Sequence, residues 1–406
     1  MVWPFKNSGL PFKIWILALI SFINAVSFTI LIPILYPYAK QFGLSDFHAS
    51  LLTTSYALSL FVATPIIGRL SDSWGRKKLL ILCLLGTVAS NIWASLATVP
   101  AMFYAARILD GLTGGNTSIA NAIVVDISSP QDRAQAFGLL DASFRMGFVT
   151  GPAISFLSQS LPTFPGVTSL GMSFLASAVI AFVASILSLF FLPETLKQKR
   201  EIKLNLGIFG LGAIAKSLRR SKVGNLLWLT LFSGFTFTIF TFALQPFFIN
   251  VLGQDARSLA ALLTLVGFSG VVMQLVGVAP VTRRFPLTRI LVVIFIIRAS
   301  IFLIIPLSHL ELFVVGGILL GMINAYPLPI LSTLLSIHSG PKEQGEIQGV
   351  KASILGFSNA FGPAFSGLLV SEGYRVPFVV AGLLTLLTAG FANKLAYLDK
   401  TPTASP

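Results

Sequence analysis

Two pairs of oppositely charged residues lie inside long apolar stretches of this sequence. Arg107 and Asp110 are three residues apart, and Asp141 and Arg145 are four apart, so the members of each pair share one face of a helix. A carboxylate beside a guanidinium can exchange a proton, or it can form a simple neutralising ion pair. Because an ionisable group inside a lipid bilayer costs about 3 kcal/mol on insertion scales, we interpret both pairs as candidate proton-coupling residues. The alternative for Arg107 and Asp110 is a structural bridge near the outer surface.

Two further charged residues have roles that the sequence leaves open. Arg298 stands alone within an apolar stretch, and we expect it to be structural or to extend its guanidinium toward the lipid headgroups. Asp126 closes another apolar stretch, where it either bridges to a neighbouring basic loop or caps the end of a helix.

Uncharged polar residues within the apolar stretches are candidates for lining a substrate cavity, although each of them also has the alternative of bonding to a neighbouring helix. They are Asn24, Asn116, Gln245, Asn324 and Asn359. The sequence has 35 phenylalanines and few charges at such positions. This composition favours an amphipathic or lipophilic organic ligand over a phosphorylated one.

The residue groups expected of an enzyme are missing from the sequence. With three histidines and the single cysteine Cys83, it has no cluster with metal-ligand spacing and no nucleophile with a plausible base. It also has no phosphate-binding glycine loop followed by Lys-Ser/Thr. We therefore predict that the protein is not an enzyme, with no catalytic residue, no metal and no cofactor.

The elements that carry these residues are predicted to be membrane-spanning helices. Of the 406 residues, 55% are hydrophobic and 10% are charged, against about a quarter charged in soluble domains. About twelve stretches reach the roughly 20 apolar residues that a helix needs to cross a bilayer. They cover 13–38, 48–69, 79–97, 101–126, 136–158, 168–192, 223–250, 259–280, 288–308, 311–336, 349–370 and 376–397. The sequence thus predicts an all-α membrane protein with twelve transmembrane helices.

The placement of the basic residues predicts the orientation of the chain. Lysines and arginines number 28 against 14 acidic residues, which gives a net charge of +14. If the N-terminus is cytoplasmic, about 22 of the 28 lysines and arginines fall in cytoplasmic segments, which is the positive-inside bias of membrane proteins. We therefore predict cytoplasmic N- and C-termini and a lipid bilayer as partner, and we exclude nucleic acid.

The two halves of the sequence are related by an internal repeat. A shift of 211 residues places Leu51-Leu52-Thr53 on Leu262-Leu263-Thr264 and Gly151-Pro152-Ala153 on Gly362-Pro363-Ala364. Because six predicted helices separate the copies, both halves keep the same orientation, as in two-bundle transporters with a site between parallel repeats. The predicted domains are an N-terminal six-helix bundle over 1–192, a cytoplasmic linker over 193–222, and a C-terminal six-helix bundle with a short cytoplasmic tail over 223–406. The linker is either a helix on the membrane surface or a flexible tether.

A short basic loop carries the most specific motif. The segment from Gly68 to Leu80 reads GRLSDSWGRKKLL. Its glycines allow a sharp turn, its aspartate can accept hydrogen bonds from a helix N-terminus, and its basic residues hold the loop at the cytoplasmic surface. The loop resembles the signature loop of the major facilitator superfamily, which implies that Asp72 latches the two bundles in one state. The gating residues are then Gly68, Asp72, Gly75, Arg76 and Lys77, with Asp126 as a candidate partner.

Three other segments resemble the tetracycline and multidrug efflux branch of that superfamily, the drug–proton antiporters with twelve helices. They are Arg107 to Gly115 (RILDGLTGG), Gly147 to Pro152 (GFVTGP) and Leu192 to Thr195 (LPET). The resemblance implies that Gly147, Gly151 and Pro152 form the antiporter motif, which is associated with export. It also implies that Arg107 faces the central cavity and takes part in proton transfer.

The residues and the resemblance together predict a secondary active transporter that works by alternating access. It is expected to export small amphipathic or lipophilic organic compounds in exchange for protons, as a monomeric, multi-pass, multidrug-efflux-like protein of the plasma or bacterial inner membrane. Asn24 departs from this pattern, because many drug–proton antiporters carry an acidic residue at the matching position of the first helix. A major facilitator importer or uniporter of a sugar or metabolite is therefore an alternative, and a non-transporting membrane sensor is an alternative of another class.

Overall fold

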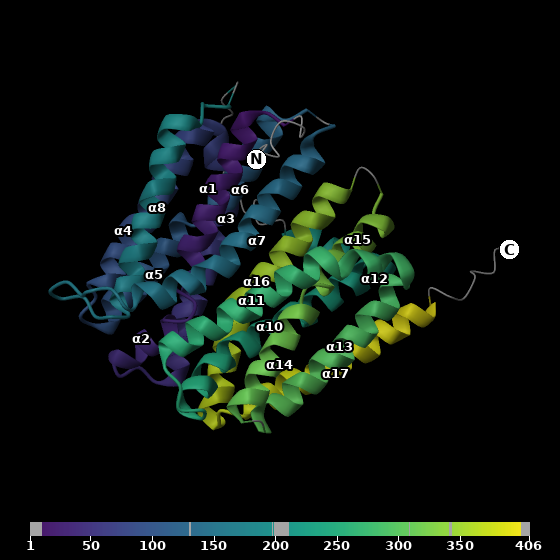
Figure 1. Ribbon diagram of the computed structural model, residues 1–406. Coiled ribbons are helices and arrows are strands. Elements are labelled where there is room, and N and C mark those ends of the chain that lie inside the picture. The colour runs from purple at the N-terminus through teal and green to yellow at the C-terminus, as the bar shows by residue number, and fades with distance from the viewer. Residues whose placement is uncertain are drawn as a thin grey trace, which may run out of the picture. The chain divides into compact units, whose positions relative to one another are not determined.

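The computed structural model describes residues 10–129, 131–196, 198, 211–307, 309–340 and 343–398. Much of the predicted linker lies outside these residues. Every regular element within the described ranges is a helix (Figure 1).

The described helices form twelve membrane crossings. Ten of them are long and apolar enough to span a bilayer by length and composition. The other two crossings are formed by the pair α5 (Pro100–Thr113) and α6 (Asn116–Ile127), and by α7 (Arg133–Ser158). The break between α5 and α6 leaves each of these helices too short to span a bilayer alone. The charges on α7 lower the apolarity of that helix below that of the other ten. The predicted all-α membrane fold with two parallel six-helix repeats is confirmed.

The chain packs as two compact units. The first unit contains the described residues up to 38 and from 59 to 198. Its helices, in addition to α5 to α7, are α1 (Phe12–Thr29), the greater part of α3 (Asp46–Trp74), α4 (Arg76–Ser95) and α8 (Gly171–Phe191). Helix α1 packs on α7, and α4 packs on α5 and α8. Lipid is as apolar as leucine, so small and polar residues hold such helices together. The hydroxyls of Ser27 and Ser177, 2.8 Å apart, join α1 to α8 in this way.

The second unit contains residues 39–58 and the described residues from 211 onward. The main helices of this unit are α9 (Leu211–Leu218), α10 (Ser221–Asn250), α11 (Ala256–Val276), α12 (Val278–Arg284), α13 (Leu287–Ile304), α14 (Leu310–Ile323), α15 (Pro327–His338), α16 (Gln344–Glu372) and α17 (Val376–Leu398). Helix α10 packs on α16 and α17, α13 packs on α17, and α11 packs on α14. Short helix α2 (Leu35–Gln41) and α3 each belong partly to both units.

The internal repeat reappears in the positions where helices begin. Helices α4 and α13 begin at residues 76 and 287, α6 and α15 at 116 and 327, and α7 and α16 at 133 and 344, each pair 211 residues apart. The packing repeats as well, since α10 meets α16 as α1 meets α7. The two halves are therefore built to one plan.

Four of the predicted continuous helices are interrupted. The predicted helix 101–126 breaks at Gly114 and Gly115, and 311–336 breaks between Ile323 and Pro327, the equivalent point of the repeat. The predicted helix 259–280 breaks at Gly277, and 13–38 divides after Thr29. Glycine and proline favour such breaks, and a membrane protein tolerates them where neighbouring helices satisfy the freed backbone groups.

Candidate functional site

Arg76 is the centre of a charged cluster at the loop between α3 and α4. Its Nη1 lies 2.6 Å from Oδ1 of Asp72, in the last turn of α3, and its Nε donates to Oδ2 of Asp126 at 3.1 Å. Thr195 Oγ1 donates to the same Asp126 oxygen at 3.0 Å. The guanidinium is thus shared by two carboxylates from two helices, and Asp126 bridges to the basic loop rather than only ending a helix.

The N-terminus of α4 is capped by Glu194, a residue that the sequence analysis did not include in the site. Its Oε1 accepts the backbone N–H of Arg76 at 2.9 Å, and its Oε2 accepts that of Lys77 at 3.2 Å. A carboxylate at this position satisfies free N–H groups and favours the positive end of the helix dipole. We expected Asp72 to accept hydrogen bonds from a helix N-terminus; that expectation was wrong, because Asp72 is occupied by Arg76. The LPET motif, quoted for its resemblance alone, was the signal for Glu194.

The two glycines of the loop have different structural roles. Gly75 precedes α4 with φ 111° and ψ 140°, a conformation that L-residues rarely adopt. Gly68, on α3, lies where a Cβ atom would be 2.9 Å from Oγ of Ser118 on α6. Gly75 therefore makes the turn, and Gly68 permits close helix packing.

Arg107 and Asp110 form a buried ion pair on α5. Arg107 Nη1 donates to Asp110 Oδ2 at 2.9 Å, and their side chains are 2% and 8% exposed. The hydroxyls of Thr87 and Ser90, on the adjacent α4, lie within hydrogen-bond reach of the Asp110 carboxylate. The pair is thus removed from both lipid and water, and polar groups of a second helix surround its acid.

Asp141 and Arg145 also form an ion pair, but an exposed one. Arg145 Nε donates to Asp141 Oδ2 at 2.7 Å, and the two side chains are 41% and 63% exposed respectively. Arg145 lies 12 residues after the start of α7 and 13 before its end. Because charges at mid-span are costly against acyl chains, this face of α7 must border water or other protein.

Gly147 and Gly151 allow α1 to approach α7 closely. A Cβ atom on Gly147 would lie 2.5 Å from the carbonyl oxygen of Phe22, and one on Gly151 would meet Thr29. Thr29 Oγ1 donates to the carbonyl oxygen of Gly147 at 3.1 Å. Pro152 follows inside the helix and is buried. The GxxxGP segment is thus a helix-packing motif.

The structure joins only two of the candidate cavity residues. Asn116, the first residue of α6, donates through Nδ2 to Oδ1 of Asn24 on α1 at 3.0 Å, and its own Oδ1 is buried without a partner. Gln245 is buried in α10, also with an unpartnered Oε1. Asn324 is the C-cap of α14, at the break before α15, and is half-buried, whereas Asn359 is exposed on α16.

Arg298 is deeply buried, which agrees with the alternative of a structural role and not with the alternative that it extends to the lipid headgroups. It is 1% exposed in α13, where its Nη2 donates to Thr236 Oγ1 at 3.0 Å and to the Ser233 carbonyl oxygen at 3.3 Å. Phe295 and Phe302 place their rings 5.1 and 5.8 Å from the guanidinium carbon. Within the described residues, no acid pairs with it and no group of three metal-ligating side chains is present.

Twelve crossings in two parallel repeats, with ion pairs inside the spans, define a membrane transporter of the two-bundle type. A sequence profile described as Major Facilitator Superfamily matches residues 17–297 and 226–406. The chain belongs to the major facilitator superfamily.

Individual relatives agree with this assignment. The chain is 26% identical to Multidrug resistance protein 2 of Bacillus subtilis (strain 168) over 375 residues, which cover 91% of each chain. It is 27% identical to the class C tetracycline resistance protein of Escherichia coli over 363 residues, covering 84% of this chain and 85% of that one. The crystal structure of the human organic anion transporter MFSD10 (TETRAN) matches the fold with a TM-score of 0.70 at 20% identity, covering 94% of this chain and 100% of that one.

Proposed function

We propose that this transporter exports small amphipathic or lipophilic organic compounds by alternating access, in exchange for protons. The observation that supports this proposal is the buried pair of Arg107 and Asp110. A buried charge pair is weak evidence for stability, because its desolvation offsets much of its Coulomb energy. Its presence inside a span therefore favours a functional role.

Asp110 is the proton acceptor in this proposal. When a proton binds its carboxylate, the acid becomes neutral while Arg107 keeps its charge, so the ion pair at 2.9 Å is weakened. The Arg107 guanidinium is then stabilised by contacts with other acceptors. The hydroxyls of Thr87 and Ser90 remain as partners for the neutral Asp110. Protonation drives transport only if the two access states differ in proton affinity, and the exchange of Arg107 partners supplies such a difference.

The Arg76 cluster serves as the gate. Its ion pairs with Asp72 and Asp126 lie at a helix end, partly exposed, where a change of partner costs less than it does in the core. Glu194 fixes the backbone of Arg76, so that its guanidinium moves between acceptors from a constant anchor.

The substrate class follows from the relatives and the polar groups of the spans. The relatives are named for resistance to multiple drugs, for resistance to tetracycline and for transport of organic anions. Asn24, Asn116, Gln245, Asn324 and Asn359 supply neutral polar contacts, and Asp141 and Arg145 supply charged ones. We place the protein in the plasma or bacterial inner membrane as a monomer.

Transport in proteoliposomes tests the proposal. A panel of lipophilic dyes and antibiotics is assayed with and without an imposed proton gradient, for the wild type, Arg107→Ala and Asp110→Asn. The matched control is Asp255→Asn, the same chemical change at the N-cap of α11, where asparagine caps equally well. Gradient-driven movement is expected to disappear in both test variants and to persist in the control. Undiminished coupling in Asp110→Asn would remove Asp110 from the mechanism.

Uniport is the second candidate function, and Asn24 favours it. Its carboxamide is bonded to Asn116 and does not titrate, so the first helix offers no proton site at this position. A uniporter moves substrate down its own gradient at a rate that is indifferent to the proton gradient. The same assay distinguishes this outcome, because wild-type transport would then be equal in both conditions.

A further inference from the structure

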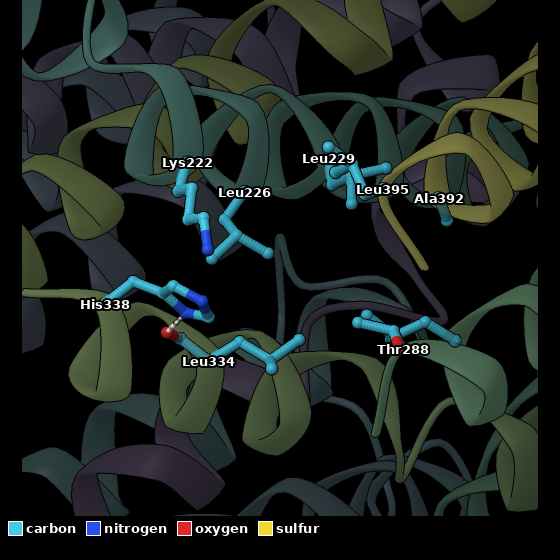
Figure 2. A pocket seen from close by; sticks show the side chains of 9 residues that line it. Lys222, Leu226, Leu229, Thr288, Leu334, His338, Ala392 and Leu395 are labelled. Atoms are coloured by element: carbon cyan, nitrogen blue, oxygen red, sulfur yellow. Dashed lines mark hydrogen bonds between the residues drawn. The ribbon is translucent and has the colours of Figure 1, made fainter. Parts of the chain in front are cut away.

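A hollow in the second unit is too small for an organic ligand. It lies between the ends of α10, α13, α15 and α17, and Lys222 and His338 point into it beside a lining of leucines (Figure 2). Its volume is about 30 Å³, which leaves room for about one or two water molecules. An organic ligand therefore binds elsewhere, and accessible charged groups inside the spans are the other candidates for recognising one.

The ion pair of Asp141 and Arg145 on α7 leaves most of its polar atoms free. Arg145 donates to Asp141 Oδ2 through Nε at 2.7 Å. Within the described residues, Nη1 and Nη2 of Arg145 and Oδ1 of Asp141 have no hydrogen-bond partner. The two free Nη groups match the two oxygens of a carboxylate, and the free Oδ1 can accept a hydrogen bond from an ammonium group. The pair thus offers one binding group for an anion and one for a cation, without breaking its own bond.

These free groups are accessible in the middle of the span. The side chains of Asp141 and Arg145 are 63% and 41% exposed. At 1.5 Å per residue, Arg145 lies about 18 Å from the start of α7 and about 20 Å from its end. Arg107 and Asp110, by contrast, are buried among polar groups of a second helix. The pair on α7 is therefore the one that a ligand can reach.

The second half of the chain shows that the fold does not require these charges. The positions 211 residues after Asp141 and Arg145 are Ala352 and Gly356, on α16. Helix α16 packs on α10 as α7 packs on α1. A helix of the same plan thus folds with small neutral residues at both positions. This internal comparison favours a role of the charged pair in recognising a ligand.

Two aromatic side chains lie beside the pair. Phe144 and Phe148 follow Asp141 and Arg145 by three residues each, and therefore lie on the same side of the helix. Their ring centroids are 6.4 Å apart, and Phe148 is 43% exposed. The face thus combines opposite charges with an exposed aromatic surface.

We propose that this face of α7, formed by Asp141, Phe144, Arg145 and Phe148, binds amphoteric organic compounds that carry a carboxylate, an amine and an aromatic body. The carboxylate accepts from Nη1 and Nη2 of Arg145, the ammonium donates to Oδ1 of Asp141, and the aromatic body packs on Phe148. The inference rests on the proposed transport of organic compounds and names their chemical class. It is independent of proton coupling.

Binding to the purified full-length chain is the test. Ciprofloxacin, which carries one carboxylate and one amine on an aromatic body, is titrated into the protein in uncharged detergent at neutral pH by isothermal titration calorimetry. Its ethyl ester lacks the negative charge and its N-acetyl derivative lacks the positive one, while both keep the aromatic body. The wild type should bind ciprofloxacin about tenfold more tightly than either derivative, the lower range for one hydrogen bond to a charged group.

Single substitutions assign each charge to its partner. Asp141→Asn and Arg145→Gln should each weaken ciprofloxacin binding about tenfold. Arg145→Gln should not weaken binding of the ester, which has no carboxylate, and Asp141→Asn should not weaken binding of the N-acetyl derivative, which has no ammonium. The matched control is Glu343→Gln, which neutralises the acid of another partly exposed ion pair and should leave ciprofloxacin binding unchanged.

Several results would overturn the proposal. They are the absence of saturable ciprofloxacin binding, equal binding of the three compounds by the wild type, undiminished binding in Asp141→Asn and Arg145→Gln, and an equal loss in Glu343→Gln. A chain with both Asp141→Ala and Arg145→Ala should remain folded and lose the preference for ciprofloxacin; failure to fold would show that the pair is structural. Because no gradient is present, these results leave proton-coupled export untouched. Specific binding without gradient-driven movement would contradict the exchange for protons and leave this site standing.

Discussion

The turn before α4 depends on a single residue, Gly75. Its φ of 111° lies outside the range that a side chain accepts, and a Cβ atom there would be 2.5 Å from Oε2 of Glu194. A substitution at this position therefore strains the backbone and displaces the carboxylate that caps α4. The backbone geometry of the turn therefore requires glycine at position 75, independently of any role of Gly75 in gating.

Gly75→Ala is expected to lower the free energy of unfolding by about 1–3 kcal/mol, the usual cost of a residue held in a disfavoured backbone region. Thermal unfolding in detergent measures the loss. The matched control is Gly138→Ala in α7, where an added Cβ meets nothing within 4 Å. That variant should be neutral or slightly more stable, because alanine is the better helix former. Equal losses in the two variants would contradict the assignment.

The helix crossings of the two halves are stabilised by equivalent contacts. Thr29 Oγ1 donates to the carbonyl oxygen of residue 147, and Thr238 Oγ1 donates to that of residue 358, at 3.1 and 3.0 Å. The acceptors are 211 residues apart. Gly151 and Gly362, also 211 apart, bring each helix pair so close that an added Cβ would collide with the threonine. At each crossing, a glycine of one helix thus lies in van der Waals contact with a threonine of the other.

Gly151→Ala and Gly362→Ala are both expected to destabilise the protein by about 1–3 kcal/mol, the usual cost of overpacking. The repeat also provides matched controls, Gly138→Ala and Gly349→Ala, where the added Cβ has no neighbour within 4 Å. Melting temperatures of the four variants, with transport rates beside them, check the prediction. If only Gly151→Ala reduced transport while all four kept their stability, the motif would act in transport rather than in packing.

The beginnings of α10 and α16 are joined by a bidentate ion pair. Arg220 donates through Nη1 and Nη2 to Glu343 at 2.6 and 2.8 Å. Hydrogen bonding to Arg220 lowers the pKa of Glu343 below its ordinary value of 4.5, and the same bond raises the pKa of Arg220. The folded chain therefore binds the Glu343 proton less tightly than the unfolded chain does.

A lowered carboxyl pKa makes the contribution of this pair depend on pH. The stabilisation is present above pH 4.5 and is lost as the pH falls through the lowered pKa of Glu343. Melting temperatures of the wild type and Glu343→Gln should therefore differ most above pH 4.5 and converge below it. Glu372→Gln, the same change at the opposite end of α16, should show no such convergence. Because both side chains are partly exposed, added salt should reduce the difference.

The sequence predicted the helices better than their interruptions. Apolarity runs through Gly114 and Gly115 without a change, and the bilayer accepts either a straight or a broken helix there. The ion pairs of α5 and α7 were predictable, because they follow from helical spacing of three and four residues. The capping by Glu194 and the burial of Arg298 were not, because both depend on which helices become neighbours. Asn24 and Asn116 were each candidates, but their contact required the fold.

On the scale of the whole chain, charge is distributed unevenly between the two ends of the helices. The sequence carries a net charge of +14, and its basic residues gather where α9, α10 and α13 begin. Membrane proteins retain such segments on the cytoplasmic side. The proposed direction of export depends on this orientation.

The single cysteine makes the orientation measurable. Cys83 is buried in α4, so wild-type protein should react little with a membrane-impermeant maleimide. In a Cys83→Ser background, Arg257→Cys in the first turn of α11 and Lys216→Cys on α9 each expose one thiol, since both native side chains are exposed. With intact cells, Arg257→Cys should be labelled and Lys216→Cys should react only after the membrane is permeabilised. The reverse pattern would place the basic helix ends outside the cell, and the proposed exporter would then run inward.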